Sequence, residues 1–400
     1  MSPPGPSLAT LMVALLAAHL AGMGAFLTVP VLAPAIAAET GLAASLAGLH
    51  TALVYAGALL SGPFTGPLVQ RHGGVRVLQV GLLLIGCGIA LAAIGTPWAF
   101  AASAFLAGLG HGPVTPGSSH LIAARTPPRR RALVFSMKQA GVPAGAMLIA
   151  AAAPVIALLA GSWRISVLAM ASIAFLVAAA IQPLRAALDA GRDSGRGADV
   201  GAIAREAVGS VGMLRSDRAL RRLTIMACGY GVAQFCFLTF FVAFQVAALG
   251  TPLAEAGLIL AFAQAAGITG RLGWALMADR VGGRVPLVLC GFGAAAGGLA
   301  LAVAGPWTPS LVVILAGIVM GATAVGWNGV MLAEAARIAP QGQVGAATAA
   351  LSFAFAITMM IAPPAFTGLV GLTGGYAAGF LMCVLAVLVG AWAIGTGPGR

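Results

Sequence analysis

Long apolar runs, separated by short polar or charged segments, make up almost the whole chain. Twelve of these runs approach or exceed the ~20 residues that a helix needs to cross the hydrocarbon core of a bilayer. The runs are Leu8–Ala38, Leu42–Val69, Val77–Ile94, Trp98–Ala123, Ala132–Ala160, Ile165–Leu184, Leu223–Leu249, Leu253–Met277, Val285–Ala304, Ser310–Ala333, Val344–Leu372 and Tyr376–Ile394. The pattern predicts an all-α membrane protein with twelve transmembrane helices.

Composition and charge agree with a membrane protein. Hydrophobic residues make up 60% of the chain and charged residues 8%, whereas about 25% of a soluble domain is charged. The net charge of +12 would suggest nucleic-acid binding in a soluble protein. Here, with a cytoplasmic N-terminus, every arginine between the runs except Arg164 falls on the cytoplasmic side. This positive-inside pattern predicts a multi-pass protein of the cell inner membrane, with both termini cytoplasmic and no nucleic-acid partner.

Residues that could support catalysis or hold a metal form no recognisable set in the sequence. All five cysteines lie inside apolar runs, so we expect free thiols that pack as small hydrophobic side chains. No Cys/His spacing resembles a metal site, and no Asp/Asp, Ser/His or HExxH arrangement suggests an intramembrane enzyme. We therefore expect no metal, no cofactor and no enzymatic activity.

The second half of the chain repeats the first at an offset of 209 residues. Matching positions include Arg71 with Arg280, Gly73 with Gly282, and Pro97-Trp98 with Pro306-Trp307. One offset that holds along the chain predicts two six-helix halves with the same orientation. We place the halves at residues 1–184 and 223–400, joined by a cytoplasmic linker at 185–222 that carries mixed charge.

A charged loop with two glycines occurs once in each half and resembles the signature of the major facilitator superfamily. The second copy runs from Gly270-Arg271-Leu272 through Ala278-Asp279-Arg280 to Gly282-Gly283-Arg284, and the first is Gly66-Pro67-Leu68-Val69-Gln70-Arg71-His72-Gly73-Gly74. Gln70 stands where the family usually has an aspartate. The resemblance implies a conformational role for Arg71, Gly73, Asp279, Arg280, Gly282 and Arg284.

The resemblance extends over the whole chain. It implies the family's fold, with twelve helices in two parallel-repeat six-helix halves. It also implies a monomer in the bilayer that moves a small-molecule substrate by alternating access, with or without a co-transported proton. The helix 8 pattern is similar to that of members moving oxalate, formate or monocarboxylates, and the helix 5 and 10 segments to those of bacterial facilitators near cyanate transporters.

Several uncharged polar side chains interrupt the apolar runs and are candidates for the transport path, which helices 1, 4, 7 and 10 line in the family. A polar residue in lipid must face protein or water. For His19 the alternative is a neutral imidazole bonded to a neighbouring helix, and for the aromatic stripe of helix 7 it is core packing. The candidates are His19, His111, Tyr230, Gln234 and Asn328.

Two cations inside the apolar runs give the clearest indication of a substrate. Lys138 lies roughly 10 Å into helix 5 past Arg131, and Arg271 lies about 12 Å back along helix 8 from Asp279. The sequence places no acidic residue in the membrane centre to neutralise them, and a buried charge without a partner is strongly disfavoured. An anionic substrate, such as a carboxylate, would supply that partner. The alternatives are snorkelling of either side chain or an ion pair between Arg271 and Asp279.

Two other functions fit the pattern less well. An exporter of hydrophobic compounds is the main alternative, but the exporter signature of helix 5 has a Gly-Pro pair where this chain has Val142-Pro143. The missing membrane acid also argues against cationic drugs. A membrane receptor without transport would need an extramembrane surface for a partner, and the short loops offer none.

Overall fold

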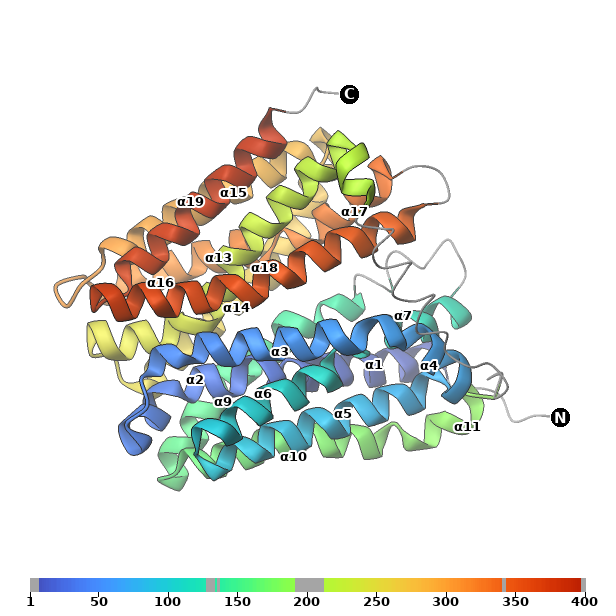
Figure 1. Ribbon diagram of the computed structural model, residues 1–400, viewed down its shortest axis with the longest axis horizontal. Coiled ribbons are helices and arrows are strands. Elements are labelled where there is room, and N and C mark those ends of the chain that lie inside the picture. The colour runs from blue at the N-terminus through green and yellow to red at the C-terminus, as the bar shows by residue number, and fades with distance from the viewer. Residues whose placement is uncertain (1–6, 127–133, 135–136, 191–211, 340–342, 397–400) are drawn as a thin grey trace. The chain divides into compact units, whose positions relative to one another are not determined.

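The structure is a computed structural model that describes residues 7–126, 134, 137–190, 212–339 and 343–396 (Figure 1). Regular structure in these residues is helical. The main α-helices are α1 (Leu8–Gly22), α2 (Gly24–Thr40), α3 (Ala47–Ser61), α4 (Thr65–His72), α5 (Gly74–Leu91), α6 (Pro97–His111), α7 (Val114–Arg125), α9 (Gly141–Ala160), α10 (Trp163–Ala180), α11 (Arg185–Leu188), α13 (Arg218–Leu249), α14 (Leu253–Val281), α15 (Arg284–Val303), α16 (Ser310–Met320), α17 (Asn328–Ile338), α18 (Val344–Thr373) and α19 (Ala377–Gly395).

Eleven helical stretches of the described residues are long and apolar enough to cross a membrane. Each coincides with one of the predicted runs, within a few residues at most ends. The remaining predicted run, Trp98–Ala123, is built as α6 and α7 with an interruption at Gly112 and Pro113. Proline lacks the backbone N–H and its ring crowds the preceding turn, so a break at this point follows from the sequence. The protein is therefore an all-α, multi-pass membrane protein.

The first run also contains a break, at a different place from the prolines. Pro30 and Pro34 both lie inside α2. The interruption falls at Met23, whose backbone N–H bonds to carbonyls of α1, between Gly22 and Gly24. Transmembrane helices tolerate internal proline where neighbouring groups satisfy the freed carbonyls.

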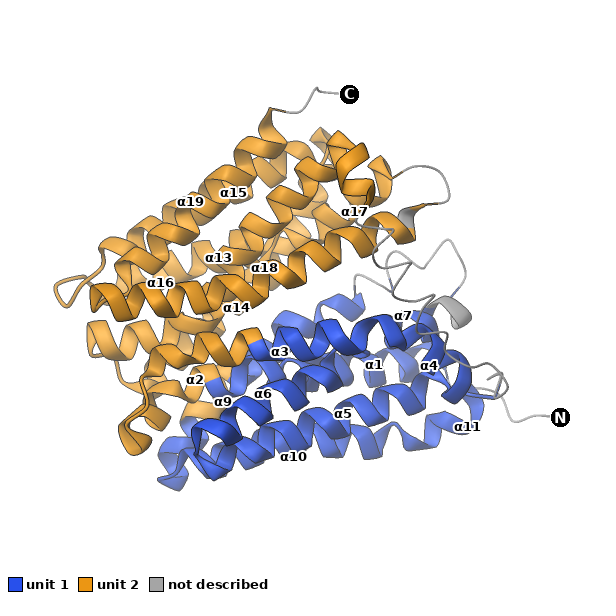
Figure 2. Ribbon diagram, viewed as in Figure 1, with its two compact units in different colours: residues 1–29, 53–149, 155–204 blue, residues 30–52, 150–154, 205–400 orange. Residues whose placement is uncertain are grey.

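The chain divides into two compact units, which Figure 2 colours separately. Unit 1 consists of residues 1–29, 53–149 and 155–204. Unit 2 consists of residues 30–52, 150–154 and 205–400. Residues 191–211 of the predicted linker lie outside the described residues. Helices α2, α3 and α9 each contribute residues to both units.

Small residues let the helices approach closely inside each unit. In unit 1, a Cβ on Gly145 of α9 would lie 2.7 Å from the backbone of Leu20 in α1. In unit 2, the missing Cβ of Gly229 in α13 makes room for the backbone carbonyl of Ala386 in α19. The glycine face of α9 is thus a packing surface for α1, as expected for helices whose association depends on close van der Waals contact.

Unit 2 includes a tight contact between the start of α3 and the C-terminal helices. The hydroxyls of Thr51 and Thr239 lie 3.0 Å apart in a buried pair. Thr367 of α18 donates to the Ser45 carbonyl at 2.6 Å. Gly48 has no room for a side chain, because Phe240 and Thr367 occupy the space next to it. Residues 30–52 are therefore held to α13 and α18 by hydrogen bonds and by close packing.

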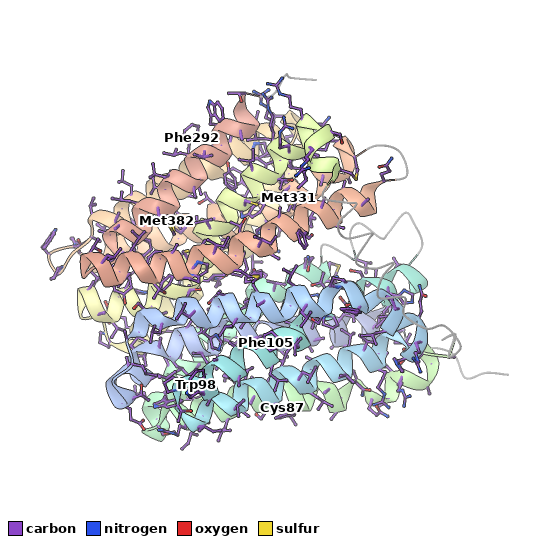
Figure 3. All side chains as sticks on the ribbon, in the orientation of Figure 1. Cys87, Trp98, Phe105, Phe292, Met331 and Met382 are labelled. Atoms are coloured by element: carbon purple, nitrogen blue, oxygen red, sulfur yellow. The ribbon has the colours of Figure 1, made fainter. Side chains whose placement is uncertain are left out.

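Large apolar side chains cover the outward faces of the helices, where lipid would contact them (Figure 3). Trp98 at the start of α6 is 84% exposed and Phe292 of α15 is 57% exposed. All five cysteines are free thiols, as predicted; Cys87 on α5 is exposed, and Cys236, Cys290 and Cys383 are buried.

Candidate functional site

Lys138 lies in the interior of unit 1 and its ammonium group is held by oxygens of α7. The side chain is 1% exposed. Its Nζ donates to Ser119 Oγ at 2.9 Å, to Ser118 Oγ at 3.2 Å and to the Thr115 carbonyl at 3.4 Å. These three acceptors are neutral oxygens, and they fix the position of the ammonium. Residues 115–119 of α7 therefore hold this lysine.

The hydroxyls that hold Lys138 are themselves oriented by α7. Ser118 Oγ and Ser119 Oγ donate to the Thr115 carbonyl at 2.9 and 2.7 Å. Each hydroxyl therefore presents a lone pair toward the ammonium. The three groups lie in the first turns of α7, directly after the break at Gly112 and Pro113. An irregular helix is tolerated inside a membrane where it is buried in protein or lines a cavity.

Two predicted histidines join Lys138 in unit 1. His19 of α1 is 3% exposed, and it lies within electrostatic range of Lys138 and His111. His111 at the end of α6 is half-buried, bonds through Nδ1 to the Gly22 carbonyl at 3.1 Å, and packs edge-on against Phe26. The structure thus brings three of the predicted site residues together in unit 1.

Glycines on α9 hold this cluster close to α1. A Cβ on Gly141, one turn after Lys138, would lie 3.0 Å from the Cβ of His19 and 3.1 Å from the Leu16 carbonyl. A larger residue at Gly141 would therefore push α1, and His19 with it, away from the lysine.

A π-helical turn at Gly321–Val325 organises a second group of polar side chains, in unit 2. Such turns break the regular bonding of a helix and occur often at functional sites. Side chains satisfy three of its carbonyls. Trp274 Nε1 donates to the Ala322 carbonyl at 2.7 Å, Trp327 Nε1 to that of Ala324 at 2.8 Å, and Asn328 Nδ2 to that of Val325 at 3.2 Å.

Gln234 and Asn328, both predicted from sequence, meet beside this turn. Asn328 Nδ2 donates to Gln234 Oε1 at 3.2 Å, linking α13 to the start of α17. Gln234 is buried and Asn328 is half-buried. The pair therefore presents one partly accessible amide at the junction of two helices.

Tyr230 has a different environment from the one expected of a path-lining residue. Its ring is 1% exposed and packs edge-on against Trp327. Its hydroxyl donates to the Leu287 carbonyl of α15 at 2.6 Å. The phenol thus ties α13 to α15 within unit 2, and its donor is already used.

Arg271 lies on α14, next to the face that contacts the π-helical turn. Gly267 and Gly270 pack against that turn, and Arg271 itself is half-buried. Gln264, seven residues earlier on the same face of the helix, is fully buried, and neither of its amide atoms has a hydrogen-bond partner among the described residues. Gln264 and Trp274 were not among the site residues predicted from the sequence; the polarity of Gln264 in an apolar helix was the available signal.

The two charged loops differ in what surrounds their glycines. Gly73 has φ +91° and Gly282 has φ +80°, a backbone region that favours glycine. Asp189 fills the space beside Gly73 and caps α5, accepting from the N–H groups of Val75 at 3.0 Å and Arg76 at 3.1 Å. Among the described residues, nothing lies within 4 Å of a Cβ placed on Gly282.

Charged residues of the second loop lie mostly at the surface of unit 2. Asp279 and Arg280 are exposed and Arg284 is half-buried at the start of α15. Glu334 lies beside Gly283 and pairs with Arg337 at 2.7 Å. The two residues are three positions apart, a spacing at which helical side chains can pair.

Comparison with known proteins defines the class to which this fold belongs. The peptide transporter POT in complex with sulfate has a TM-score of 0.78 at 17% identity, covering 99% of this chain and 96% of that one. The nucleoside transporter NupG has a TM-score of 0.77 at 13% identity, covering 96% and 98%. A bacterial homologue of the human lysosomal transporter Spinster, in an inward-facing and occupied conformation, has a TM-score of 0.76 at 14% identity, covering 98% and 96%. The fold is that of a membrane transporter.

The family follows from the sequence match. Residues 14–363 match the Major Facilitator Superfamily, and the chain belongs to it. No curated protein matches the chain at a significant level. The resemblance seen in the two charged loops is thereby confirmed at the level of the superfamily, and membrane transport of a small molecule is the function that it indicates.

The capped loop of unit 1 gives the first prediction. Gly73→Ala forces a side chain into the left-handed region, at about 1–2 kcal/mol, and also displaces the Asp189 carboxylate from the cap of α5. Gly282→Ala has the same backbone strain and open space around it. We expect a clearly larger drop in the thermal unfolding midpoint of the purified protein for Gly73→Ala than for Gly282→Ala. Equal drops would show that the cap contributes nothing to stability.

The buried phenol of Tyr230 gives the second prediction. Tyr230→Phe leaves the Leu287 carbonyl without its donor in a dry environment, which should lower stability by about 1–3 kcal/mol. Because the ring contacts are retained, ligand affinity should not change. Thermal unfolding and equilibrium binding, measured on the same preparation, separate the two effects. A variant with normal stability and weakened binding would instead place the hydroxyl in the transport path.

Proposed function

We propose that this protein is a secondary transporter that moves a small organic anion, of the carboxylate class, by alternating access. In this proposal α6 and α7 together form the twelfth span, and the halves at residues 1–184 and 223–400 rock about a central site. Both termini lie in the cytoplasm, the protein is a monomer, and the membrane is the cell inner membrane.

The observation that carries the anion proposal is the fixed ammonium group of Lys138. Three neutral oxygens hold it in the interior of unit 1. Keeping a charge out of water is costly, and the cost is offset when an opposite charge comes close. A lysine held in place by hydroxyls is therefore prepared to receive an anion and to reject a cation.

The charge distribution of the sequence supports the same conclusion. Glu39 is the only acidic residue before Asp189. Glu39 lies at the end of α2, and Asp189 is occupied with the N-terminus of α5. The N-terminal membrane helices therefore bring positive charge to the site and little negative charge, a distribution that concentrates anions.

Arg271 supplies a cation to unit 2, and we propose that it binds the substrate as well. Its guanidinium can contact both oxygens of a carboxylate at once, which a lysine cannot do. His19, His111, Gln234 and Asn328 would complete the lining with groups that hydrogen-bond the rest of the substrate. For Tyr230, which we expected in the path, its ring would contribute rather than its hydroxyl.

The charged loops are proposed to bias the conformational equilibrium. Asp279, Arg280, Gly282 and Arg284 of the second loop and Arg71 and Gly73 of the first would make and break bonds as the inner side closes and opens. Since Gln70 replaces the family's aspartate, the first loop is proposed to rely on Asp189 for its carboxylate.

The third prediction tests the substrate class directly. Thermal-shift screening of the purified protein against sodium salts of formate, acetate, oxalate and lactate should find at least one stabilising anion. Radiolabelled uptake of that anion into proteoliposomes should follow. Stabilisation by tetraphenylphosphonium, with none of the carboxylates active, would support the alternative of a hydrophobic-compound exporter and contradict this proposal.

The fourth prediction concerns Arg271. Arg271→Lys keeps the charge and loses the two-point geometry, so uptake should fall at least tenfold while expression and thermal stability stay near those of the parent. Arg164→Lys is a matched control, because Arg164 bonds to the Ala93 carbonyl and stacks over Trp163 at the start of α10. We expect normal uptake from this control. Normal uptake by both Arg271→Lys and Arg271→Ala would remove Arg271 from the substrate site.

A further inference from the structure

One ring nitrogen of His19 is buried next to Lys138 and has no hydrogen-bond partner among the described residues. The other nitrogen, Nδ1, lies 2.8 Å from the Leu15 carbonyl. A carbonyl only accepts, so Nδ1 must carry the hydrogen. In the neutral ring Nε2 is then an acceptor with a lone pair that nothing satisfies. A buried polar atom in that condition requires an explanation.

The same reasoning applies to His111, whose Nε2 is a second acceptor in this cluster. Its Nδ1 donates to the Gly22 carbonyl, which leaves Nε2 as the acceptor of the neutral ring. The cluster around Lys138 therefore contains one ammonium and two imidazoles whose remaining nitrogens accept.

The charged and titratable groups near His19 can be named for each helix packed on α1. His111 comes from α6 and Lys138 from the turn before α9, and both interact electrostatically with His19. On α7, His120 is exposed. On α5, Arg76 lies at the first turn, and on α10, Arg164 lies at the start and bonds to Ala93. Lys138 is therefore the cation that acts most directly on His19.

An anion that binds at Lys138 would change the protonation equilibrium of His19. Without the anion, a proton on Nε2 would put a second positive charge beside the ammonium, which is unfavourable. With the anion, the negative charge offsets the repulsion, and a protonated Nε2 becomes a donor toward it. A neutral Nε2 would instead point a lone pair at the anion. Anion and proton thus favour each other's binding, and the coupling is reciprocal.

We propose that His19 takes up one proton at Nε2 when an anion binds at Lys138, so that the site loads an anion and a proton together. The proton comes from water and returns to water when the anion leaves, and no covalent bond of the anion changes. This inference rests on the proposed function and adds the coupling ion and the residue that carries it. The glycine contact between Gly141 and His19 keeps the two binding positions within reach of each other.

Titration calorimetry in two buffers tests the inference with the intact protein. The carboxylate that stabilises the protein most in the screen is titrated at pH 7.5 in MOPS and in Tris, which differ in ionisation enthalpy. We expect the two heats to differ by the amount that corresponds to about one proton taken up per anion. We also expect affinity to fall up to about tenfold per pH unit as the pH rises from 7 to 9.

Substitutions of single histidines test which residue takes up the proton. His19→Gln should bind the anion more weakly and with the same heat in both buffers. His50→Gln is the matched control: His50 is a buried histidine with no hydrogen-bond partner among the described residues, it lies in unit 2, and its variant should keep the full proton uptake. Proton uptake that survives in His19→Gln and disappears in His111→Gln would overturn the assignment.

The outcomes separate the two proposals. Anion binding with buffer-independent heat in the parent protein would overturn the proton inference alone and leave anion transport standing. Absence of any carboxylate binding would overturn both. Because the deciding comparison uses the unmodified protein, the inference can be refuted even when His19→Gln does not fold.

Discussion

The absence of water in the bilayer core governs this structure, because the backbone N–H and C=O groups in that region must find their partners inside the protein. The π-helical turn at Gly321–Val325 shows the consequence most clearly. It frees carbonyls from the regular helix, and the indoles of Trp274 and Trp327 and the amide of Asn328 satisfy them. The break between α6 and α7 is a second example. Just after it, two serine hydroxyls and the Thr115 carbonyl hold the ammonium of Lys138. Polar chemistry therefore gathers where helices are irregular, and both candidate sites lie at such places.

The cost of keeping a charge away from water also bears on which ligand a site of this kind would accept. A carboxylate near Lys138 would neutralise it permanently, and the site would then have no preference for anions. In the proposed site, two hydroxyls and a carbonyl fix the position of the ammonium, and a bound anion would offset the cost of burying its charge. An arrangement of this kind would exchange stability in the empty state for selectivity, a trade that polar sites in proteins commonly make.

Much of the fold could be predicted from the sequence, because span length and hydrophobic periodicity are local properties. Eleven of the predicted runs match helical stretches that are long and apolar enough to cross a membrane. Contacts between distant segments could not be predicted. Asp189 lies in a stretch that looks like a solvated linker, yet it is 2% exposed and caps α5 more than a hundred residues earlier in the chain. The packing of Trp274 against the π-helical turn and the burial of Gln264 depend on tertiary structure in the same way.

The sequence repeat between the two halves of the chain does not include the candidate substrate-binding residues. With the offset of 209 residues, Lys138 corresponds to Ala347, Arg271 to Gly62 and His19 to Cys228. Ser119 corresponds to Asn328, and each makes a hydrogen bond in its own unit. In the proposed transport cycle, a repeated backbone would favour two related conformations of similar energy, which alternating access requires. The candidate side chains differ between the two copies of the repeat, so each copy would offer a proposed anion different charge and hydrogen-bond partners. A repeated backbone with unrepeated side chains would thus combine alternating access with specific binding.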